Sequence, residues 1–322
     1  HNGEELLRIM NQYVSDWGWE DEFSQWMAND CTICTTLVDT IVPGRIRDPK
    51  EAAAVAERLG YEDPFLAVRE PFQMWGIQGD ESLKERLPFV KAGLPGVFVT
   101  PDVTPYKKRK VRILNGAHTA FVPGSWVAGF DIVRDCMHDE TVRGFMNTML
   151  YDEVIPTLAA DLDVEDCKAF AAAVENRFDN PFIDHALLSI CLNSTAKWRA
   201  RDLPTLKDYV AETGNLPKCL STSLATLIAF YTQELVSREG DGLHLRRADG
   251  TEYTAQDDAF VLDFYAAHAG VDDAELVHDV LSNEQMWGED LTQIAGLEEF
   301  VVNALAIVRA EGVKQAFANA QA

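Results

Sequence analysis

Basic residues are scarce in this sequence: 28 lysines and arginines stand against 52 aspartates and glutamates, for a net charge of −24 over 322 residues. A field of that sign repels phosphate backbones and anionic lipid headgroups. Nucleic acid and membrane surfaces are therefore poor candidate partners. The sequence also lacks an apolar run of about 18 residues, the length that a membrane-spanning helix needs. We expect no membrane span.

Cysteines are few and scattered, which excludes a small disulfide-stapled scaffold. Cys31 and Cys34 have the C-x2-C spacing of zinc and redox sites. No second pair and no histidine pair completes a four-ligand set, so we interpret the spacing as coincidence and expect no metal. The first residues lack the charged-then-apolar layout of a signal peptide. Together these features predict a reduced, cytoplasmic setting.

A glycine-rich phosphate-binding motif is also missing. No G-x-G-x-x-G stretch follows a predicted strand anywhere in the chain. In dinucleotide-binding domains these glycines let the backbone approach the pyrophosphate at a helix N-terminus. The sequence therefore offers no recognisable pyrophosphate site.

What is present is an α/β pattern that gives way to a helical one. Short β-branched stretches bounded by turn residues predict strands within 35–43, 70–79 and 93–100. From about residue 110 onward the apolar spacing is almost entirely helical. Within that part, Asp249-Gly250 predicts a small β-hairpin. Asn180-Pro181 predicts a turn, followed by a helix that runs to about Lys197.

Three polar residues at the start of the helical part have spacings that suit catalysis. On a helix Lys110, Asn115 and His118 lie at i, i+5 and i+8, within roughly 140° of arc. A desolvated lysine serves as a general acid or base. An amide and an imidazole aimed at one oxygen polarise a carbonyl. The alternative interpretation is a solvated basic helix start with an ordinary histidine.

The motif Lys110-x4-Asn115-x2-His118, within Lys-Val-Arg-Ile-Leu-Asn-Gly-Ala-His-Thr-Ala, resembles the active-site signature of the polyol-specific long-chain dehydrogenases, the mannitol dehydrogenase family. The flanking stretches 102–106 and 152–156 are most similar to the branch that acts on tagaturonate. The resemblance implies an NAD-dependent oxidoreductase that interconverts a keto-hexuronate and its hydroxy acid, tagaturonate and altronate. It also implies that Lys110 is the acid/base and that Asn115 and His118 position and polarise the carbonyl.

Two further segments carry the resemblance to the substrate pocket. Arg177-Phe-Asp-Asn-Pro-Phe-Ile-Asp-His185 is similar to the family's Arg-Phe-x-Asn-Pro-x-x-x-His motif, which makes Arg177 and His185 candidates to bind the sugar acid. The alternatives are a cation at a helix C-terminus and an ordinary core or surface histidine. Thr35 stands where the family has a substrate-binding asparagine. One hydroxyl replaces a carboxamide there, so the substrate stays open.

Members of the family begin with a nucleotide-binding domain. The resemblance, together with the missing glycine motif, predicts a mostly α chain in which residues 1–106 are only the terminal α/β part of a Rossmann-type domain. Its nucleotide-binding part would be absent, and residues 107–322 would form the helical substrate domain. An N-terminal nucleotide-binding domain is then expected in the complete protein. The alternatives are a fructuronate reductase, a mannitol 2-dehydrogenase, or a non-catalytic sugar-binding remnant without its cofactor half.

Overall fold

A computed structural model of the chain describes residues 2–19, 21–46 and 48–322. The chain divides into two compact units, residues 1–108 and 109–322. The helix α6 (Thr104–Lys110) begins in the first unit and ends in the second.

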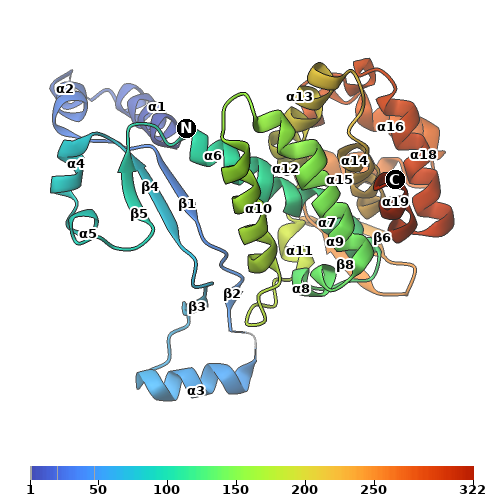
Figure 1. The fold of residues 1–322 in the computed structure, drawn as a ribbon, viewed down its shortest axis with the longest axis horizontal. Helices are drawn as coiled ribbons and strands as arrows, with labels where there is room; N and C mark the ends of the chain where they lie inside the picture. The colour runs from blue at the N-terminus through green and yellow to red at the C-terminus, as the bar shows by residue number, and fades with distance from the viewer. Residues whose placement is uncertain (1, 20, 47) are drawn as a thin grey trace. The chain divides into compact units, whose positions relative to one another are not determined.

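The first unit is built on a three-stranded sheet with the order β1-β4-β5. β1 runs antiparallel to β4, and β4 runs parallel to β5. The shorter strands β2 and β3 form an antiparallel ribbon that, with α3, extends away from this sheet (Figure 1). The elements of the unit are α1 (Asn2–Asp16), α2 (Asp21–Asp30), β1 (Thr36–Asp39), β2 (Gly44–Arg45), α3 (Pro49–Leu59), β3 (Ala67–Val68), β4 (Met74–Gln78), α4 (Glu81–Arg86), α5 (Pro88–Lys91) and β5 (Val97–Thr100).

The second unit is helical with one small antiparallel sheet, β6-β7-β8. The predicted hairpin is confirmed as β7–β8, and β6 adds a third antiparallel strand beside β7. Its first elements are the π-helix η1 (Val111–Asn115), α7 (Gly116–Val127), α8 (Val133–Met137), α9 (Glu140–Thr148), the π-helix η2 (Met149–Val154), the 3-10 turn η3 (Pro156–Leu158), α10 (Val164–Phe178), α11 (Leu187–Ile190), α12 (Ser194–Arg201) and α13 (Leu203–Thr213).

The remaining elements of this unit are α14 (Lys218–Tyr231), β6 (Glu234–Glu239), β7 (Gly242–Arg246), β8 (Glu252–Ala255), α15 (Ala259–Ala267), α16 (Asp273–Leu281), α17 (Glu284–Trp287), the 3-10 turn η4 (Leu291–Gln293), α18 (Leu297–Glu311) and α19 (Val313–Ala320).

The core of the second unit is formed around two buried helices. Eleven of the twelve residues of α7 are buried, as is every residue of α14 after Lys218. The two helices pack against each other, and α18 and α19 pack on α14. Because burial of apolar side chains is the main driving force of folding, α7 is held firmly along its length. Within the described residues, none of the helices combines the length and the apolar content that a bilayer crossing requires.

A buried carboxylate caps α14 from outside that helix. Pro217, the residue before α14, offers no side-chain acceptor to the free N–H groups of the first turn. Glu153 supplies both oxygens instead, accepting from the backbone N–H groups of Cys219 at 2.7 Å and Leu220 at 2.9 Å. Burial raises the pKa of Glu153 to about 7, although these two hydrogen bonds oppose the rise.

This raised pKa predicts a pH-dependent contribution to stability. The folded state binds the proton more tightly than the unfolded state. The contribution is therefore complete below the ordinary pKa of 4.5 and is lost as the pH rises through about 7. The loss is at most about 3 kcal/mol. Urea unfolding of the wild type and Glu153→Gln should give a difference in unfolding free energy that is larger near pH 5 than near pH 7.5. A difference that grows with pH would mean that the helix N–H groups hold Glu153 ionised.

Exposed Glu165 provides the matched control, since it pairs with Lys168 at the surface. Glu165→Gln should give the same difference from the wild type at both pH values.

Candidate active site

The three predicted catalytic residues lie on one continuous helical segment of the second unit. α6 passes directly into the π-helix η1, which passes into α7. In η1 the N–H of Gly116 donates to the carbonyl oxygen of Val111, five residues back. Single π turns inside α-helices occur frequently at functional sites. The π turn follows Lys110 and includes Asn115. Its wider winding therefore sets the direction of the Asn115 side chain relative to that of Lys110.

His118 is enclosed by aromatic rings. Its side chain is 6% exposed. The imidazole stacks on the ring of Phe178, with centroids 4.0 Å apart and planes inclined by 16°, and meets the ring of His185 edge-on at 5.4 Å. The Nε2 atom of His118 is buried and makes no hydrogen bond to the described residues. A buried nitrogen of this kind is suited to a ligand atom, because an unsatisfied buried polar group is costly.

Four basic side chains surround this histidine, and we call them the basic cluster: Arg177, His185, Lys197 and Arg201. Burial is the main cause that lowers the pKa of His118 well below its ordinary value. The positive charges of the basic cluster lower it further, because each disfavours a second cation nearby. His118 is therefore a neutral imidazole at neutral pH.

The structure brings Arg177 and His185 to the same place as His118. Arg177 lies in the last turn of α10 and is 8% exposed. The helix predicted from Pro181 to about Lys197 is wrong as one element, because residues 181–186 are a turn and an extended segment and residues 191–193 separate α11 from α12. Ala186 forms a β-bridge with Ile132, and the carbonyl of His185 accepts from Val133 N at 3.0 Å. Pairing with this neighbouring segment holds His185 against His118.

Two members of the basic cluster, Lys197 and Arg201, were not among the predicted site residues. Lys197 reads from the sequence as a solvated lysine, yet it is half-buried and donates to the carbonyl of Ile190 at 2.9 Å. Burial lowers its pKa, as it lowers that of Arg201. The i,i+4 spacing of Lys197 and Arg201 on α12 was the available signal, since it places both on one face of the helix.

Thr35 belongs to the first unit, whereas the other five predicted site residues belong to the second. It is 8% exposed and lies just before β1. Its carbonyl oxygen accepts from the backbone N–H of Gln78, at the end of β4, at 2.8 Å.

The first unit also offers one sheet edge of the kind at which nucleotides bind. The parallel strands β4 and β5 both end there, at Gln78 and Thr100. Gly79 follows β4 and donates its N–H to the carbonyl of Thr100 at 2.9 Å. In open α/β sheets, ligands bind outside the carboxyl ends of parallel strands.

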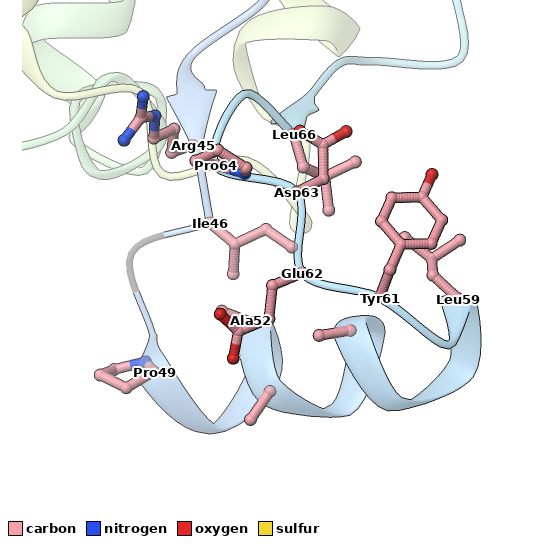
Figure 2. Close-up of a pocket in the computed structure, with 12 residues that line it drawn as sticks. Arg45, Ile46, Pro49, Ala52, Leu59, Tyr61, Glu62, Asp63, Pro64 and Leu66 are labelled. Atoms are coloured by element: carbon pink, nitrogen blue, oxygen red, sulfur yellow. The ribbon is translucent and has the colours of Figure 1, made fainter.

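A hollow of about 560 Å³ elsewhere in the first unit lies between α3 and residues 61–66 (Figure 2). Its lining is mainly aliphatic and contains none of the predicted site residues. Among the described residues, no group of three or more histidines, cysteines or acids is placed to hold a metal ion. Cys31 and Cys34 are free thiols.

Two family models match the chain. The model of the mannitol dehydrogenase C-terminal domain matches residues 102–309, and that of the mannitol dehydrogenase Rossmann domain matches residues 2–91. The second match corrects two predictions. Residues 2–91 match the nucleotide-binding domain, so the prediction that this part is absent is wrong. The expectation of a further N-terminal nucleotide-binding domain, which depended on that absence, is therefore not supported. The missing glycine motif misled the prediction, because one loop motif does not define the whole domain.

Curated relatives cover nearly the whole chain. The altronate oxidoreductase of Yersinia enterocolitica is 40% identical over 324 residues, and that of Enterobacter sp. is 41% identical over 322 residues. These alignments include 99% and 98% of this chain. The chain spans 63% of the length of each relative.

Solved structures share the fold. The Pseudomonas fluorescens mannitol 2-dehydrogenase, in a ternary complex with NAD and D-mannitol, superposes with a TM-score of 0.73 at 21% identity, covering 92% of this chain and 56% of that one. A substrate-free D-sorbitol dehydrogenase superposes with a TM-score of 0.76 at 21% identity, covering 98% of this chain and 60% of that one.

Proposed function

Because the chain belongs to the mannitol dehydrogenase family, we propose that it acts as an NAD-dependent oxidoreductase of a sugar acid, interconverting tagaturonate and altronate by hydride transfer. The identity of about 40% to two altronate oxidoreductases supports this substrate. Fructuronate is the nearest alternative in the same chemical class.

The main support for an acidic substrate is the basic cluster. Arg177, Lys197 and Arg201 gather around His118 in a chain whose net charge is −24. Asp202 adjoins Arg201 in the chain, and burial raises the pKa of its carboxyl well above the ordinary value, which disfavours a negative charge beside these cations. A carboxylate placed between the Arg177 guanidinium and the Lys197 ammonium forms short, charge-assisted hydrogen bonds, while Arg201 is engaged by the Asn115 carbonyl and the Thr119 hydroxyl. A neutral polyol gains nothing comparable.

The roles of the three helix residues follow from the chemistry of reducing a ketone. The Asn115 amide and a ring N–H of His118 donate to the ketone oxygen and stabilise the negative charge that develops on it. A neutral imidazole suits this role, since it carries one N–H to donate. The Lys110 ammonium then gives a proton to the alkoxide, and the product is the hydroxy acid. In the reverse direction, neutral Lys110 removes the hydroxyl proton.

NAD, when bound, supplies or accepts the hydride. The sheet edge at Gln78, Gly79 and Thr100 fits the position of a Rossmann nucleotide site. The described residues include no glycine-rich pyrophosphate loop, so we assign no residue to the diphosphate.

Consumption of NADH with tagaturonate, fructuronate and fructose, measured in parallel, tests the proposal. We expect the largest kcat/KM with tagaturonate and a value for fructose lower by a factor of about 100 or more. That factor corresponds to one lost charge-assisted contact of up to about 3 kcal/mol. Equal values for fructose and the two acids would refute the acidic substrate, and no consumption of NADH with any of the three would refute the reductase.

A further inference from the structure

The carbonyl oxygen of Asn115 lies at the junction between the π turn and α7, and two side chains donate to it. Thr119 donates its hydroxyl at 2.9 Å, and Arg201 donates Nη1 at 3.4 Å. The same Nη1 also donates to the hydroxyl oxygen of Thr119 at 2.9 Å. The three groups form a closed triangle between α12 and the catalytic helix.

This triangle is placed where the helical winding changes. On one side, η1 carries the five-residue bond that ends at Gly116. On the other side, α7 carries His118. A change of winding at this junction rotates His118 relative to Lys110. Thr119 is 3% exposed, so its hydroxyl has no ready replacement by solvent.

We infer that Arg201 is a positioning residue for the proposed reaction. Together with Thr119 it holds the Asn115 carbonyl and so fixes the π turn. The π turn in turn aims Asn115 and His118 at the substrate oxygen that Lys110 protonates. This inference rests on the proposed function for its kinetic consequence, but not for its contacts. A misplacement of about 1 Å costs an enzyme on the order of 100-fold in rate, so the effect falls on kcat.

Arg201 also acts on His118 through its charge. Positive charge acts on His118 from three elements: Arg177 on α10, His185 on the extended segment, and Lys197 and Arg201 on α12. Removal of the Arg201 charge lowers the free-energy cost of placing a positive charge on the His118 ring. The variant Arg201→Met therefore makes His118 easier to protonate, which reports that Arg201 lies beside His118 independently of turnover.

Arg201→Met, Arg201→Lys and Arg199→Met form the first test. Arg199 lies on the same helix and is exposed, and it is not among the charges that act on His118. Arg201→Met should lower kcat about 10- to 100-fold with little change in KM, and Arg201→Lys should recover part of the loss. Arg199→Met should behave as the wild type.

Nitrogen NMR of the histidine rings gives the second readout, which needs no turnover. With His118 assigned by loss of its signals in His118→Gln, its titration midpoint should rise in Arg201→Met and stay unchanged in Arg199→Met. If the wild type shows no turnover, the proposed function fails. The titration still tests whether the charge of Arg201 acts on His118. Equal midpoints in Arg201→Met and the wild type would overturn the inference.

Thr119→Val keeps the shape of the side chain and removes only the hydroxyl. It tests the same hydrogen bonds if Arg201→Met does not fold. It should reproduce the loss in kcat without moving the His118 midpoint, because no charge is removed. An unchanged kcat in Thr119→Val would contradict the role of the triangle in positioning.

Discussion

Replacement of Lys110 by alanine should lower kcat for tagaturonate reduction by a factor of about 100 to 10,000, the usual range for a lost general acid. The alkoxide that forms when hydride arrives then takes its proton from solvent. KM should change little, because the ammonium acts on the developing alkoxide more than on the bound ketone. Stopped-flow or steady-state NADH absorbance measures the effect, and circular dichroism checks that the fold is kept.

Lys107→Ala is the matched control for Lys110→Ala. Lys107 lies on the same helix, α6, and its side chain is exposed. This variant should retain wild-type kcat. Full activity in Lys110→Ala would remove the acid/base assignment.

Replacement of Arg177 by methionine should raise KM for tagaturonate by about 10- to 100-fold, with a small change in kcat. The buried guanidinium is proposed to bind the carboxylate, and a hydrogen bond to a charged group contributes about 1.5–3 kcal/mol. The KM for fructose, which has no carboxylate, should stay close to the wild-type value.

Arg143→Met serves as the control for the loss of a cation in the same unit. Arg143 pairs with Glu175 at 3.2 Å and is not among the charges that act on His118. Its KM for both substrates should equal that of the wild type. A KM that rises equally for tagaturonate and fructose in Arg177→Met would return Arg177 to a purely structural role.

Local sequence was informative where the site is built on one helix. Lys110, Asn115 and His118 lie on one continuous helical segment, as their spacing predicted, but the π turn that includes Asn115 departs from the α-helical winding assumed for them. The helical character of the second unit followed from the same pattern. The assignment of roles to these residues remains a prediction.

Other features depend on contacts between distant segments. The π turn before Gly116 involves Arg201, 86 residues beyond Asn115, and no local propensity specifies it. The extended segment that carries His185 is set by pairing with Ile132 and Val133 rather than by its own sequence. The two oxygens of Glu153 cap a helix 66 residues away. Periodicity does not reveal these pairings.

The first unit illustrates a different limit. A missing G-x-G-x-x-G motif was interpreted as a missing nucleotide-binding part, although the Rossmann domain model matches residues 2–91. The motif describes one loop, whereas strands and helices define the domain. The parallel pair β4–β5 and the turn at Gly79 are the features that a pattern search for glycines passes over.

The most direct test of the central claim is transfer of deuterium. The protein is incubated with tagaturonate and NADH deuterated at the reactive carbon of the nicotinamide, and the product is analysed by mass spectrometry and NMR. We expect altronate with one deuterium on the carbon that was the ketone, and no product from Lys110→Ala on the same timescale. Oxidation of the NADH without deuterium in the sugar acid, or no altronate at all from the wild type, would contradict the proposed hydride transfer.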